Sequence, residues 1–188
     1  EYIKYIMYDL RNIRFEISFK TFEELRVILS FYNKNNLYKI NIPCKNRLKK
    51  DFLLESIKIC KKDFADIDLV PHFSIQNEFR TNSFNTNRSF IEFLKSVNDF
   101  GCNEVLLVSG SQKRKTLDSI KALNYVSDNL LFSYTDLSIG VAFNPYLNSV
   151  SFENEIVRLG NKLQSGIVNS VWLQFGSDYK LLESRIDI

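Results

Sequence analysis

The chain has 188 residues, enough for one domain with a substantial core, and its residue composition is ordinary for a globular protein. A net charge of +3 is too small to indicate a nucleic-acid partner, and no apolar run approaches the length of a membrane span. The three cysteines, Cys44, Cys60 and Cys102, form no C-x-x-C pair. They argue against a disulfide or zinc framework and favour reduced thiols in a cytoplasmic protein.

Strand-like and helix-like segments alternate along the chain. From the apolar patterns, strands are expected over residues 13–19, 37–42, 67–73, 104–108, 137–143 and 170–175. Helices are expected over residues 1–12, 21–32, 51–62, 89–100, 116–127 and 153–164, with a last one capped by Asp178. Two of these helices begin at capping boxes, Thr21–Glu24 and Ser89–Glu92.

Six strand–helix units without a hairpin signal predict a parallel α/β architecture. A doubly wound sheet and a (β/α)8 barrel both fit this pattern. A complete eight-unit barrel needs about 250 residues, so the chain is short for one. In both architectures the ligand site lies at the carboxyl ends of the strands.

The fourth strand is the clearest pointer to such a site. Its continuous apolar run ends in Ser109-Gly110-Ser111, and a basic segment, Lys113-Arg114-Lys115, follows. A glycine flanked by serines and cations can bind a phosphate through backbone N–H groups and charge. The alternative interpretation is an ordinary solvated loop.

His72 is the only histidine, which excludes a multi-histidine metal site, and we expect no bound metal. No G-x-S-x-G motif supplies a nucleophile for a catalytic triad. His72 lies at the end of the expected third strand and is therefore a candidate ligand contact or, alternatively, a hydrogen-bonded structural residue. Glu16, between two apolar strand residues, is either a general acid directed into a barrel or an outward surface glutamate.

Several strand ends resemble the methylenetetrahydrofolate reductase family of flavin-dependent barrel enzymes. The resemblance spans residues 13–182 and is carried by Phe15-Glu16, Val70–Ser74, Gly101–Ser111, Ser138–Pro145 and Glu155–Gln174. It implies a (β/α)8 barrel of TIM type, of which about six βα units are present. We therefore expect residues 1–188 to form a single barrel domain that lacks the last two units, as a fragment or the product of a split gene would.

The resemblance also implies a function. NAD(P)H would reduce FAD, and reduced FAD would reduce 5,10-methylenetetrahydrofolate to 5-methyltetrahydrofolate. Glu16 would be the catalytic acid and Gln174 would bind the folate. The residues implied to bind the cofactor are His72, Ser109, Gly110, Ser111, Ala142, Asn144 and Lys162.

The chain departs from that family at two strand ends. Ser111 stands where the family has an aspartate near the flavin, and Asn144 stands where it has a tyrosine. These departures keep open an alternative function, a non-catalytic barrel paralogue that binds a folate, a phosphorylated ligand or a partner protein. In either case we expect no nucleic-acid or membrane partner, and a homo-oligomer is compatible with the sequence.

Overall fold

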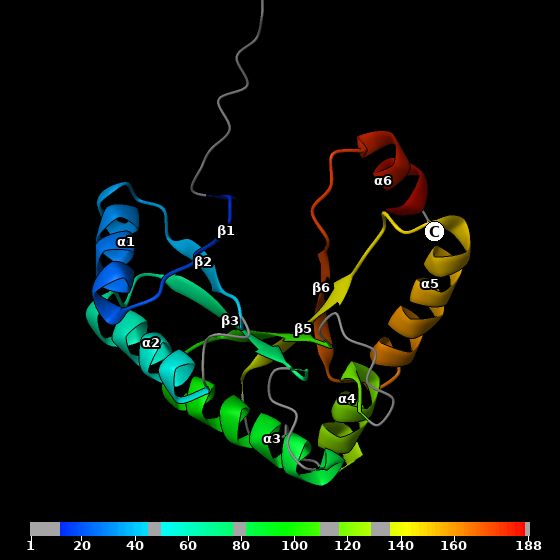
Figure 1. Cartoon of the computed structure of the whole chain (residues 1–188), viewed down its shortest axis with the longest axis horizontal. Coiled ribbons are helices and arrows are strands. Elements are labelled where there is room, and N and C mark those ends of the chain that lie inside the picture. Colours follow the sequence, from blue (N-terminus) through cyan, green and yellow to red (C-terminus); the bar gives the residue numbers. More distant parts are fainter. Residues whose placement is uncertain (1–11, 45–49, 77–81, 110–116, 129–135, 187–188) are drawn as a thin grey trace, which may run out of the picture.

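The computed structural model describes residues 12–44, 50–76, 82–109, 117–128 and 136–186. Within them, six parallel strands form one sheet in the order β1-β2-β3-β4-β5-β6. The sheet curls into a half-barrel with its helices on the outside, and it is open between β1 and β6 (Figure 1). The expected fold, a TIM-type barrel represented by six βα units, is confirmed.

Strands and helices alternate without exception through the described residues. The strands are β1 (Phe15–Glu16), β2 (Lys39–Ile42), β3 (Asp68–Ser74), β4 (Glu104–Val108), β5 (Ser138–Phe143) and β6 (Val168–Leu173). The helices are α1 (Phe22–Lys34), α2 (Lys50–Asp63), α3 (Ser83–Asp99), α4 (Ser119–Asp128), α5 (Ser149–Leu163) and α6 (Tyr179–Ile186). None of these helices is long and apolar enough to cross a membrane.

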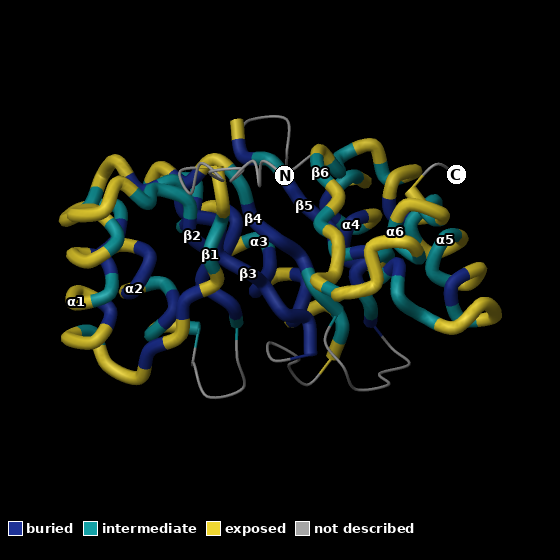
Figure 2. The backbone as a smooth tube through the Cα atoms, turned by 90° about the horizontal axis from the view of Figure 1, so that it is seen from above, coloured by how far each residue is buried: buried dark blue, intermediate teal, exposed yellow. Residues whose placement is uncertain are grey.

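The main core lies between the sheet and the outer helices. Alternate strand residues point into it and are almost completely buried: Ile40, Ile42, Leu69, Phe73, Val105, Leu107, Ile139 and Val141. Figure 2 shows this buried layer along the strands, with exposed residues on the outer sides of the helices. Because strand side chains alternate between faces, the residues between these positions face the barrel interior.

Two helices begin earlier than their sequence signals predict. Helix α3 is capped by Asn82, whose side chain accepts a hydrogen bond from the Asn85 N–H, so the expected capping box at Ser89 is wrong. Ser89 lies inside α3, and its hydroxyl accepts a hydrogen bond from Lys50 at 2.9 Å. Helix α5 is similarly capped by Asn148 rather than beginning at residue 153. The helix expected over residues 1–12 falls outside the described residues except at its last position.

The last unit departs from the regular pattern. Its strand runs over Val168–Leu173, two residues earlier than expected, and its outward residues Val171 and Leu173 are exposed. Helix α6 does not cover them and has no buried residue. Instead, Arg185 of α6 donates hydrogen bonds to the carbonyls of Pro145 and Leu147, and its guanidinium stands over the ring of Phe152. Helix α6 is therefore held at the carboxyl end of β5.

Candidate functional site

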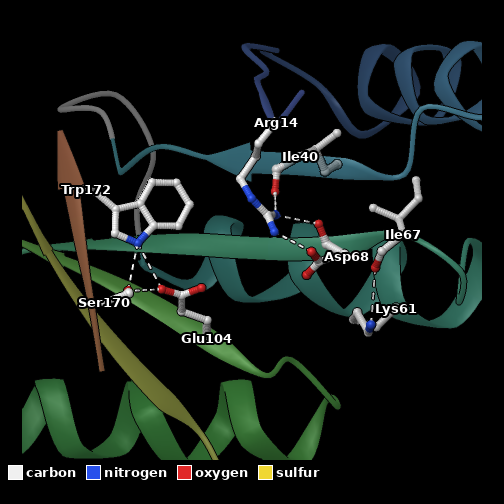
Figure 3. Close-up of polar contacts among 8 residues, drawn as sticks. All are labelled: Arg14, Ile40, Lys61, Ile67, Asp68, Glu104, Ser170 and Trp172. Carbon is white, nitrogen blue, oxygen red and sulfur yellow. Dashed lines mark hydrogen bonds and ion pairs between the residues drawn. The ribbon is translucent and has the colours of Figure 1, made fainter. Parts of the chain in front are cut away.

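The amino end of the barrel interior is filled by an ion pair. Arg14, just before β1, donates to the carbonyls of Ile40 at 3.2 Å and Asp68 at 2.8 Å, and it pairs with the Asp68 carboxylate. Figure 3 shows the guanidinium spanning β2 and β3. These contacts satisfy the charge of Arg14 at the amino end, so it is not directed toward the opposite end of the barrel.

A second cluster closes the same end from the other side. The Glu104 carboxylate accepts hydrogen bonds from the Trp172 indole N–H at 2.9 Å and from the Ser170 hydroxyl (Figure 3). The Arg14 guanidinium lies 5.7 Å from the centroid of the Trp172 ring, within the range of a cation–π interaction. Residues beside β1 and on β6 thus meet across the interior, although their strands are not paired.

The strand register places three candidate residues at one height above these clusters. Glu16 pairs with Asn41 and Asn41 with Val70. An eight-stranded barrel of this type shifts by about one residue per strand, so the residue of β3 level with Glu16 is His72. The same step from His72, which pairs with Leu106, leads to Ala142 on β5. Glu16, His72 and Ala142 therefore share one interior layer.

An observed contact supports this stagger. Ser170 of β6 pairs with Gly140 of β5, which in turn pairs with Leu106 of β4. The shift of one residue per strand therefore makes Ser170 level with Glu104, and these two side chains are hydrogen bonded.

By the same rule, Asn41 and Leu106 lie level with Trp172, directly below the layer of Glu16. The layers nearer the carboxyl ends hold Ser18, Ser74, Val108, Asn144 and Gln174.

The upper layers differ in accessibility. Glu16 and Gln174 are exposed, Asn144 is half-buried, and His72 is buried with 8% of its surface accessible. The Asn144 side chain accepts a hydrogen bond from the Tyr146 N–H at 2.9 Å, which fixes the turn after β5. The interior at this end thus offers an accessible carboxylate level with a buried imidazole, and carboxamides in the layers above them.

Ser109 has a local structural contact. Its hydroxyl donates to the Ser119 hydroxyl at 2.9 Å and accepts from the Ser119 N–H at 3.2 Å, which joins the end of β4 to the first residue of α4. Gly110 and Ser111, together with the basic segment that follows them, lie outside the described residues.

Lys162 lies on the helix side of the sheet. Its ammonium donates to the Ala142 carbonyl at 2.8 Å and stands 4.0 Å from a Glu155 carboxylate oxygen. Burial lowers the pKa of Lys162, and the nearby Glu155 opposes this effect. The amine is thus directed at the backbone of β5 rather than into the barrel interior that contains Glu16 and His72.

Asn41 was not among the residues singled out in the sequence. It is buried, and its side-chain oxygen has no hydrogen-bond partner among the described residues. The signal was present in the strand Lys39–Ile42, where a single carboxamide alternates with two isoleucines. The described residues contain no cluster of three potential metal ligands.

No family model and no curated protein matches the chain. Solved structures match its fold across 93% of its length: N-acetylneuraminate lyase from Fusobacterium nucleatum at 14% identity and TM-score 0.60, and dihydrodipicolinate synthase from Agrobacterium tumefaciens at 12% and 0.59. A third is 2,3-dimethylmalate lyase, described as a member of the PEP mutase/isocitrate lyase superfamily, at 8% and 0.64. The chain spans only 59–60% of the length of these proteins. At such identities the likeness shows the fold alone.

The comparisons correct the expected identity. The resemblance to methylenetetrahydrofolate reductase is wrong, and with it the oxidoreductase function and the FAD cofactor, because these three barrels that share the fold are two lyases and a synthase. Those enzymes give no support to a non-catalytic paralogue either. The two side chains that distinguish the family, an aspartate and a tyrosine, are absent from this chain, which has Ser111 and Asn144 in their places. NAD(P)H and methylenetetrahydrofolate as partners, a homo-oligomer and a cytoplasmic location stay predictions that no observation tests.

Proposed function

We propose that the chain forms part of the active site of a lyase-type enzyme that cleaves a carbon–carbon bond in a small hydroxylated carboxylic acid. The observation that carries this proposal is the interior layer in which Glu16 and His72 lie level. Carboxylates and imidazoles are the side chains most used in general acid–base catalysis. Two of the enzymes that share the fold are lyases named for hydroxylated carboxylic acids, N-acetylneuraminate and 2,3-dimethylmalate.

Such a cleavage needs two protein groups, one that takes a proton from the substrate and one that gives a proton to it. Glu16 takes the proton of the substrate hydroxyl, and the C–O bond becomes a carbonyl as the adjacent carbon–carbon bond breaks. The electron pair of that bond passes to the departing carbon, which an adjacent carboxylate or keto group of the substrate stabilises, and His72 supplies the proton that this carbon gains. One proton leaves the substrate and one returns, so no oxidant or reductant is needed.

In the part of the chain that the structure describes, the lysines of the strands and of α5 favour acid–base chemistry over a Schiff base. In the described strands, the interior lysine is Lys39, at the amino end of β2, and Lys162 lies behind β5 with its amine on a backbone carbonyl. Neither can reach a substrate at the carboxyl ends of the strands. The other interior carboxylates of the described strands, Asp68 and Glu104, are occupied at the amino end.

The test is cleavage of 2,3-dimethylmalate and N-acetylneuraminate by the full chain in D2O, followed by NMR. We expect products in which the departing carbon carries deuterium. Glu16→Gln and His72→Gln should each slow cleavage by about a hundredfold or more, the lower range for a lost general acid or base. Glu153→Gln, the same change at an exposed site on α5, should have no effect. The proposal fails if the wild-type chain cleaves neither compound, or if both site variants retain full activity.

A further inference from the structure

Asn41 is the one interior residue of β2 whose burial has no local explanation. Its side-chain oxygen is buried without a hydrogen-bond partner among the described residues, and the whole residue is only 8% exposed. Leaving a buried acceptor unsatisfied costs about 1–3 kcal/mol. Buried polar atoms in folded proteins almost always have a partner, so this oxygen indicates a donor that the described residues do not supply.

The direction of Asn41 follows from its neighbours. Ile40 and Ile42 are fully buried in the core between sheet and helices, so Asn41 faces the barrel interior. It pairs with Glu16 on β1 and lies one layer below it. A group bound beside Glu16 therefore has the Asn41 oxygen beneath it.

The other members of this layer are apolar. Leu106 of β4 is 6% exposed, and Trp172 of β6 has its indole N–H engaged by Glu104 and Ser170. Since its polar atom is already bonded, the Trp172 ring presents only carbon to the layer above. The floor of the proposed site thus combines one hydrogen-bond acceptor with two hydrophobic side chains.

We infer that Asn41, Leu106 and Trp172 form a specificity floor for a substrate end that carries a hydroxyl next to a short alkyl group. In the bound state Asn41 accepts the hydrogen bond of the hydroxyl, and rotation about the C–O bond then presents this single proton to Glu16, one layer above, which removes it. Leu106 and Trp172 contact the alkyl group. The inference rests on the proposed function for the class of substrate, and it names the feature by which this site selects within that class.

Trp172 provides a direct readout because it is the only tryptophan in the chain. The full chain is titrated, with Trp172 fluorescence as the signal, against 2,3-dimethylmalate, against 2,3-dimethylsuccinate, which lacks the hydroxyl, and against malate, which lacks both methyl groups. We expect 2,3-dimethylmalate to bind at least about tenfold more tightly than 2,3-dimethylsuccinate, because the latter leaves the Asn41 oxygen unpaired. Malate should also bind more weakly, since it leaves the apolar floor uncovered.

Asn41→Leu should remove the preference for the hydroxyl, so that 2,3-dimethylmalate and 2,3-dimethylsuccinate bind equally. It should also raise the urea midpoint of unfolding, because an unsatisfied buried acceptor is replaced by an apolar group of similar size. A residue with a purely structural role would lower that midpoint. Asn41→Ala serves as a second variant should leucine not fit, and Asn161→Leu, at an exposed site on α5, is the control.

The outcomes separate this inference from the proposed function. If the chain cleaves neither compound but still binds 2,3-dimethylmalate more tightly than 2,3-dimethylsuccinate, and loses this preference in Asn41→Leu, the lyase proposal is refuted and the specificity floor stands. Equal affinity of the wild-type chain for 2,3-dimethylmalate and 2,3-dimethylsuccinate would overturn the floor, and so would the absence of binding at millimolar concentrations. Discrimination retained in Asn41→Leu would also overturn it.

Discussion

Ser170 donates a hydrogen bond to the carboxylate of Glu104, although β5 lies between their strands. The contact is possible because β5 has a glycine, Gly140, at the intervening interior position. A Cβ atom built there would lie 2.7 Å from the Ser170 oxygen and 2.6 Å from the Trp172 indole nitrogen. The missing side chain of Gly140 therefore lets β6 reach β4 across the barrel interior.

Gly140→Ala should destabilise the protein by about 1–3 kcal/mol, the usual cost of forcing an extra carbon into a packed interior. It should also shift the fluorescence of Trp172, whose ring must move away from Glu104. Gly160→Ala in α5 is a matched control, because no atom lies within 4 Å of the added carbon. Since alanine favours helices, this control should raise stability by about 0.5–1 kcal/mol. Urea unfolding measures both, and equal effects of the two substitutions would contradict the packing explanation.

The sequence was sufficient to predict the alternation of strands and helices because each helix and strand carries its own apolar period. The Thr21 cap of α1 illustrates this local information: its hydroxyl accepts from the Glu24 N–H, while the Glu24 carboxylate accepts from the Lys20 N–H. The cap at Asn82 was missed because an asparagine without a following glutamate resembles a loop. Ser89 had the capping pattern but was surrounded by helix on both sides.

The interior layers could not be predicted from the sequence. Which residues of β1, β3 and β5 lie level depends on register and stagger, and neither is encoded in a local pattern. Alternation alone could direct Glu16 and His72 to the interior, but it could not place them level. The roles of Gly140 and Asn41 depend on neighbours at least 25 residues away in the sequence, so they emerged only from the three-dimensional structure.

The three cysteines should differ in reactivity. Burial raises the pKa of the Cys60 thiol to about 12 and of the Cys102 thiol to about 11, whereas Cys44 is half-buried. Because the thiolate is the reactive form, neither buried thiol should react with iodoacetamide at pH 8 in the folded protein. Peptide mass spectrometry should find the label on Cys44 first, and on all three cysteines in urea. Rapid labelling of Cys60 in the native state would contradict its placement in the core.

Lys162 should make the free energy of unfolding depend on pH in the alkaline range. Burial lowers its pKa below the ordinary 10.5, so the unfolded chain binds more protons than the folded chain in the interval below 10.5. Stability from this residue therefore rises as the pH increases through that interval. Relative to Lys162→Met, the wild type should gain free energy of unfolding between pH 7 and pH 10. Urea titrations at several pH values measure this difference. For the control Lys58→Met, at an exposed site on α2, the difference from the wild type should stay constant between pH 7 and pH 10. A difference that is constant or falls with pH would contradict the assignment.

The outer side of β6 should cause the isolated chain to associate. Val171 and Leu173 are 40% and 46% exposed, whereas their paired residues on β5, Val141 and Phe143, are buried. No charged residue or proline, the usual protection of a free strand edge, occurs between residues 165 and 177. Sedimentation velocity should therefore show larger species as the concentration of the wild-type chain rises.

Replacing both Val171 and Leu173 by lysine should shift that distribution toward the monomer, because charge on an exposed strand disfavours pairing with another copy. The matched control is Val27→Lys with Val150→Lys. These two residues are even more exposed, at 71% and 72%, but they lie on helices, which offer no free backbone groups for pairing. If the helix variant disperses the larger species as well as the strand variant does, association is a general effect of surface hydrophobicity. If the wild-type chain is monomeric at all concentrations, the edge of β6 does not pair with another copy.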